Sequence, residues 1–164
     1  MIIITSFAVF EGADLEATQK AITENAGNSE VERILICTES SRDLIFDSLE
    51  NCGLDTAKIE VVNFSSRPTF QDLFGILNEK IIDYAPIAIM NSDVAFSESH
   101  DVRKVKDLFD FFGASRRSPV LMLSRRDYCG GKWKLRLQDD AGLPNLLSVD
   151  CWIFNYFTEV SDCD

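Results

Sequence analysis

The chain has 164 residues, of which 46% are hydrophobic and 26% are charged, and its formal net charge is −11. This length and balance suit a globular domain that buries its own core, so we expect a single domain over residues 1–164. Nucleic acids and anionic membrane surfaces bind mainly through Lys and Arg that neutralise negative charge. The acidic composition therefore argues against both as partners.

The start of the chain, MIIITSFAVFEGADLE, contains no basic leader, and no apolar run approaches the ~20 residues that span a bilayer. The five cysteines are an odd number and show no paired CxxC spacing. We therefore expect a cytoplasmic protein with reduced thiols and no membrane span. His100 is the only histidine, which disfavours a Cys/His zinc site and any catalytic triad that needs a second histidine.

Apolar runs of strand length alternate with segments in which hydrophobic residues recur at helical spacing. This alternation predicts an α/β fold with a mostly parallel sheet covered by helices. The expected strands are Ile2–Val9, Arg33–Cys37, Lys58–Phe64, Ile87–Met90, Val120–Leu123 and Cys151–Phe154.

Four helices are expected between these strands, each with one apolar face. The second and third begin with the spacing of a capping box, Ser40 with Asp43 and Thr69 with Asp72. The faces consist of Leu15, Thr18 and Ile22; Ile45, Leu49 and Cys52; Leu73, Phe74, Leu77 and Ile81; and Val102, Val105, Leu108, Phe109 and Phe112. Residues 129–145 contain glycine, proline and both signs of charge without a sustained period, which predicts a long loop and a candidate lid.

Ligands of open α/β sheets bind at the carboxyl ends of the strands, and here the residues that leave the strands are polar. These segments are TESSR at 38–42, SSR at 65–67, NSD at 91–93 and SRRD at 124–127. Because no glycine-rich phosphate loop is present, a bound phosphate needs another counter-charge. A divalent cation on Asp93 would supply it. The alternative is that Asn91 and Asp93 only cap the turn after the fourth strand.

The sequence resembles GT-A type glycosyltransferases. IAIMNSDVAF, residues 87–96, is similar to the apolar strand that ends in the family's DxD motif, with Asn91 at the first acidic position and Asp93 at the second. ILICTESS, RPTFQDLFGILN, LSRRDY and SVDCWIF resemble further segments of such proteins in the same order. The resemblance extends from Ile2 to about Phe154, and many family members continue beyond it into acceptor-binding structure.

This resemblance implies a Rossmann-like GT-A sheet, mostly parallel, with a late antiparallel strand and helices on both faces. It also implies that Asp93 binds Mn²⁺ or Mg²⁺ on the donor diphosphate and that Asn91 is a neutral ligand or a sugar contact. Glu39 is the candidate for recognising the nucleotide base. Arg125, preferred over its neighbour Arg126, and more weakly Arg67 are candidates for gripping the diphosphate.

Asp150 precedes the last strand and reaches the same edge as Asp93 if that strand is antiparallel. There it is a candidate general base, and its alternatives are a carboxylate linked to the metal or a plain loop acid. The function that the resemblance implies is a glycosyltransferase that moves a sugar from a nucleotide diphosphate donor to an unknown acceptor with a divalent metal. The alternative is a noncatalytic nucleotide-sugar-binding or protein-interaction module that retains the donor half of the fold.

Overall fold

The structure is a computed structural model that describes residues 1–7, 13–50, 54, 56–80, 85–96, 99–113, 120–123, 126–129, 132–135 and 150–155. In chain order its elements are β1 (Ile2–Ser6), α1 (Ala13–Gly27), β2 (Arg33–Thr38), α2 (Arg42–Glu50), a 3-10 turn (Thr56–Lys58), β3 (Ile59–Asn63), α3 (Phe70–Lys80), β4 (Pro86–Met90), α4 (Ser99–Gly113), β5 (Val120–Leu123), β6 (Arg126–Cys129), β7 (Lys132–Leu135) and β8 (Cys151–Asn155). None of the helices in these ranges is long and apolar enough to cross a membrane.

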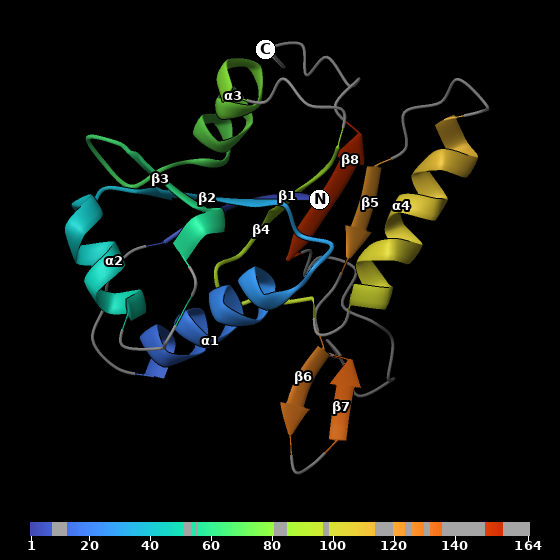
Figure 1. Cartoon of the computed structure of the whole chain (residues 1–164), viewed down its shortest axis with the longest axis horizontal. Coiled ribbons are helices and arrows are strands. Elements are labelled where there is room, and N and C mark those ends of the chain that lie inside the picture. Colours follow the sequence, from blue (N-terminus) through green and yellow to red (C-terminus); the bar gives the residue numbers. More distant parts are fainter. Residues whose placement is uncertain are drawn as a thin grey trace, which may run out of the picture.

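Six strands form one twisted sheet in the order β3-β2-β1-β4-β8-β5 (Figure 1). The pairs β1–β2, β1–β4 and β2–β3 are parallel, whereas β8 is antiparallel to both of its neighbours, β4 and β5. The expectation of a mostly parallel sheet with a late antiparallel strand is therefore confirmed.

Helices cover both faces of this sheet, as expected. Side chains of successive strand residues point to opposite faces, so Ile3 and Ile36 join the core under α1, α2 and α4, and Ile2 and Leu35 join the core under α3. At the β8 end, the Phe74 ring of α3 stacks on Phe154 at 5.8 Å between ring centroids.

The two helix starts predicted from capping boxes differ in outcome. Thr69 and Asp72 form the expected reciprocal pair: the Thr69 N–H donates to Asp72 Oδ2 at 2.7 Å, and the Asp72 N–H donates to Thr69 Oγ1 at 3.3 Å. The prediction of Ser40 as the cap of α2 is wrong, because Ser41 Oγ accepts the Leu44 N–H instead. The backbone of Ser40 is engaged elsewhere, since its N–H donates to Thr38 Oγ1 and its carbonyl accepts from the Asn63 side chain.

The prediction of a long loop over residues 129–145 is also wrong in part. Lys132–Leu135 forms β7, which pairs antiparallel with β6 as a two-stranded sheet separate from the main one. The alternating sequence KWKL and the preceding Gly-Gly pair are typical of a β-hairpin, and that signal outweighs the absence of a helical period.

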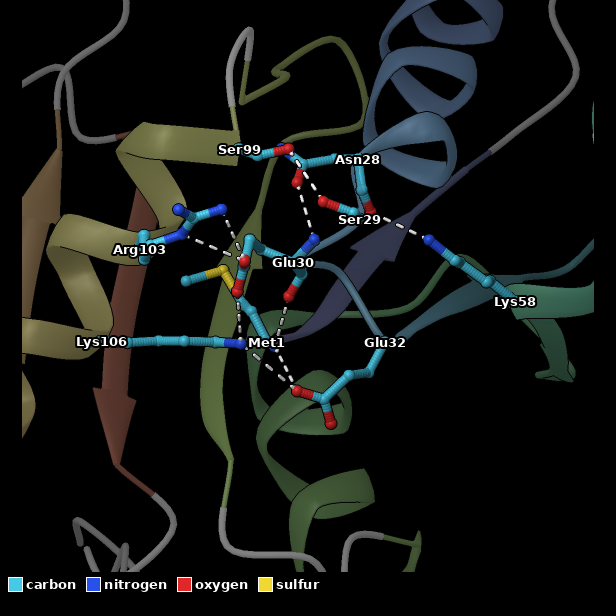
Figure 2. Close-up of polar contacts among 9 residues, drawn as sticks. All are labelled: Met1, Asn28, Ser29, Glu30, Glu32, Lys58, Ser99, Arg103 and Lys106. Carbon is cyan, nitrogen blue, oxygen red and sulfur yellow. Dashed lines mark hydrogen bonds and ion pairs between the residues drawn. The ribbon is translucent and has the colours of Figure 1, made fainter.

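A cluster of charges ties α4 to the connection between α1 and β2 (Figure 2). The carboxylate of Glu30 accepts hydrogen bonds from Arg103 Nε at 3.2 Å and from Lys106 Nζ at 3.1 Å. The amino group of Met1 donates to the Glu30 carbonyl at 2.8 Å and to Glu32 Oε1 at 2.9 Å. These contacts join the start of β1, the start of β2 and α4 at the end of the sheet opposite the polar strand exits.

Candidate functional site

A pocket of about 370 Å³ lies at the carboxyl ends of the parallel strands, beside the first turns of α1. It is lined by Ser6, Phe7, Leu15, Ala17, Thr18, Glu39, Arg67, Pro68, Asn91, Ser92 and Asp93. In the strand order, β2 and β3 lie on one side of β1, and β4, β8 and β5 lie on the other. The pocket thus occupies the point where the strand order reverses, which is where α/β sheets of this type bind ligands.

Four of the candidate residues from the sequence line this one pocket. Glu39 follows β2, Arg67 follows β3, and Asn91 and Asp93 follow β4. All four side chains are exposed, so each can reach a ligand in the pocket. Arg125 lies outside the described residues, and its role stays a prediction.

The Asn91–Asp93 segment forms a tight turn that is fixed to the start of β8. The Val94 N–H donates to the Asn91 carbonyl at 3.2 Å, which closes the turn. The Asn91 N–H donates to the carbonyl of Asp150 at 3.0 Å, and Asn91 Nδ2 donates to Asp150 Oδ1, also at 3.0 Å. The Asn91 side chain therefore bonds to Asp150 rather than capping its own turn.

Asp150 occupies a different environment from the other candidates. Because β8 is antiparallel, Asp150 lies at the same edge of the sheet as Asn91, but its side chain is only 6% exposed and it is not among the residues that line the pocket. Its backbone continues the sheet, since its N–H donates to the Leu123 carbonyl at 3.2 Å. In this arrangement the carboxylate of Asp150 directly holds the Asn91 amide.

Asn25 of α1 and Asn28, which follows the end of that helix, contact the segment after the Asn91–Asp93 turn, and sequence reasoning missed both. Asn25 bonds to the backbone of Val94 and Phe96, and Asn28 Nδ2 reaches the Phe96 carbonyl at 3.5 Å. The available signal was spacing: Asn25 falls three residues after Ile22, on the apolar face of the helix, where a polar residue requires a buried partner.

The described residues limit the kind of cation that this site could hold. They contain no group of three or more His, Cys, Asp or Glu side chains that could enclose a metal ion. Asp93 offers a carboxylate in the pocket, and Asn91 retains its amide oxygen as a ligand because the bond to Asp150 uses the nitrogen. This donor set fits Mg²⁺ or Mn²⁺ that takes one or two protein oxygens and completes its shell with water and substrate phosphate.

No protein-family model and no curated protein sequence matches this chain. Solved structures do match its fold. HddC from Yersinia pseudotuberculosis, in a complex with GMP-PN, is 10% identical with a TM-score of 0.56, and the match covers 94% of this chain and 76% of that one. A 4-diphosphocytidyl-2C-methyl-D-erythritol synthase from Anaerococcus prevotii is 14% identical with a TM-score of 0.51, covering 94% and 70%.

TarS 1–349 from S. aureus is 13% identical with a TM-score of 0.53, and the match covers 94% of this chain and 46% of TarS. At these identities the matches show the fold alone. The chain has the Rossmann-like fold that nucleotidyltransferases share with GT-A glycosyltransferases, as the sequence resemblance implied.

Proposed function

We propose that this chain binds a nucleotide diphosphate sugar in the pocket at the strand reversal and transfers the sugar to an acceptor. The observation that carries the proposal is that the exits of β2, β3 and β4 bring a carboxylate, a guanidinium and the NSD turn to one pocket. The fold of HddC, which holds GMP-PN, supports a nucleotide as the ligand class.

The chemistry of the lining assigns a role to each charged side chain. Arg67 has five N–H donors in a planar fork, which suits the oxygens of a diphosphate. Glu39 is an acceptor on the far side of β1 from Asp93 and suits the N–H and O–H groups of a base or ribose. The diphosphate would therefore lie between Arg67 and the NSD turn.

The NSD turn is the proposed cation site. Asp93 would hold the ion, with the Asn91 amide oxygen as a neutral ligand or a contact to the sugar. When bound, the ion would neutralise negative charge on the departing nucleoside diphosphate. Because the amide N–H of Asn91 donates a hydrogen bond to Asp150 Oδ1, the orientation of the Asn91 amide oxygen is set before any ligand binds.

For Asp150 we propose the general base of the transfer, supported by its hydrogen bond to Asn91, which lines the pocket. The environment of Asp150 favours a second candidate function. The low exposure of Asp150 and its bond to Asn91 equally suit a carboxylate that only orients the NSD turn. In that case the chain would bind the donor without transferring its sugar.

The binding step is tested by thermal shift with UDP-, GDP- and dTDP-sugars, each with and without Mn²⁺. A ligand at 100 times its Kd stabilises the native state by about 2.7 kcal/mol. For a chain of this size, that energy raises the Tm on the order of 5–10 °C. We expect Asp93→Ala to abolish the Mn²⁺-dependent part of the shift.

Asp107→Ala is the matched control, because it removes the same charge from an exposed position on α4 that does not line the pocket. If Asp93→Ala keeps the full Mn²⁺-dependent shift, the cation assignment is wrong. Hydrolysis or transfer of the bound donor then separates the enzyme from the binding module. Release of pyrophosphate from a nucleoside triphosphate and a sugar phosphate would instead identify nucleotidyl transfer.

A further inference from the structure

The segment that carries Asp93 is anchored to α1 by one buried amide. Asn25 is 4% exposed, and its Nδ2 donates to the Val94 carbonyl at 2.9 Å. Its Oδ1 accepts the Phe96 N–H, also at 2.9 Å. The side chain thus bonds to the backbone as a neighbouring strand would, one donor and one acceptor against the same stretch of chain.

Two further contacts connect the same helix to the same segment. The hydroxyls of Thr18 and Ser92 lie 3.4 Å apart and share a hydrogen bond. Phe96 is 9% exposed and belongs to the apolar core under α1. Because Thr18 and Asn25 are seven residues apart, they lie on one face of α1, and that face follows the segment from Ser92 to Phe96.

We infer that Asn25 is a positioning residue that holds the NSD turn where the Asp93 carboxylate can bind the cation of a nucleotide ligand. This inference rests on the proposed function and extends it to a residue outside the pocket. If the turn moved away from α1, a buried amide and two backbone groups would lose their partners, so the bonded arrangement is strongly favoured. A cation with few protein ligands depends on such support, since misplaced ligands bind weakly.

The test measures how much Mn²⁺ tightens binding of the nucleotide diphosphate identified by the donor screen. Calorimetry gives the ratio of the Kd without metal to the Kd with metal, which we expect to be about tenfold or more in the wild type. In Asn25→Ala we expect this ratio to fall to about twofold or less, with the metal-free Kd little changed because Glu39 and Arg67 follow other strands. Leu49→Ala is the stability control, because it removes a fully buried side chain from α2.

If Asn25→Ala keeps the wild-type ratio, or if Leu49→Ala loses as much, the inference is wrong while the proposed function stands. A wild-type protein whose nucleotide binding ignores Mn²⁺ would refute the proposed function, and this inference with it. Amide exchange on the wild type tests the anchor without any variant. The Phe96 N–H should be protected to the level of core amides, and exchange at the rate of an open loop would overturn the inference.

Discussion

Thr5 tests the energetics of the core independently of any ligand. It lies in the middle of the sheet on β1, opposite Ile36 of β2 and Met90 of β4, and is 2% exposed. Its Oγ1 is buried and has no hydrogen-bond partner among the described residues. We expect Thr5→Val to stabilise the protein, because valine has nearly the same shape, suits a strand and has no hydroxyl to desolvate.

The size of the effect follows from the cost of the unpaired hydroxyl. A buried polar group without a partner costs about 1–3 kcal/mol relative to one that is paired or absent. For a domain of this size, each kcal/mol shifts the Tm by about 2–4 °C, so Thr5→Val should melt several degrees higher than the wild type.

Thr38 is the matched control on the adjacent strand. It is fully buried like Thr5, but its Oγ1 accepts the Ser40 N–H at 3.0 Å. Thr38→Val should therefore lose about 1–3 kcal/mol in the free energy of unfolding. Urea unfolding of both variants at pH 7 decides the matter. If Thr5→Val loses as much stability as Thr38→Val, the Thr5 hydroxyl has a partner and our reasoning fails.

Three further predictions concern ionisable groups. Asp150→Asn keeps an oxygen that can accept the hydrogen bond from the Asn91 amide, but this oxygen cannot take up a proton. Affinity for the sugar donor should therefore be retained, and turnover should fall by about 10²–10⁴. Turnover at the full wild-type rate would exclude Asp150 as the base. The hydrogen bond from Lys106 is the main cause that lowers the pKa of Glu30 from its ordinary 4.5. The Tm of the wild type should therefore exceed that of Glu30→Gln at pH 7, and this difference should shrink as the pH falls below 4.5. A difference in Tm that stays constant down to pH 3 would contradict this. Burial and, to a smaller extent, the charge of Asp150 raise the pKa of the Cys151 thiol to about 12. Iodoacetamide at pH 8 should therefore label Cys151 only after denaturation, as measured by peptide mass spectrometry. Labelling of Cys151 in the native protein at the rate of a free thiol would refute this prediction.

The sequence predicted the sheet well because buried strands are continuous apolar runs bounded by polar residues. Val120–Leu123 matches its observed bounds, and Cys151–Phe154 is one residue short. The pocket residues followed from the rule that ligands bind where strands end, since Glu39 and Arg67 needed only the positions of β2 and β3. The reversed direction of β8 is not encoded in its local pattern and came from the family resemblance.

The errors arose where a tertiary contact decides between local alternatives. Ser40 and Ser41 have equal intrinsic preference for a helix cap, and the bond from the Asn63 side chain to the Ser40 carbonyl assigns them different roles. Asn25 reads locally as a residue near the end of a helix. The structural role of Asn25 depends on its hydrogen bonds to a segment about seventy residues later in the chain. A local sequence pattern cannot include a contact over that separation.

We expect the proposed donor to need a metal ion, because the chain is acidic and the described lining of the pocket contains fewer cations than anions. Among the described lining residues, Glu39 and Asp93 are negative and Arg67 is positive, on a chain with a net charge of −11. A diphosphate brings at least two more negative charges, and like charges about 4 Å apart repel by roughly 4 kcal/mol at the dielectric of a protein surface. A divalent ion held by Asp93, as we propose, would turn that repulsion into attraction. The same carboxylate that disfavours the bare nucleotide would then be the residue that selects its metal complex.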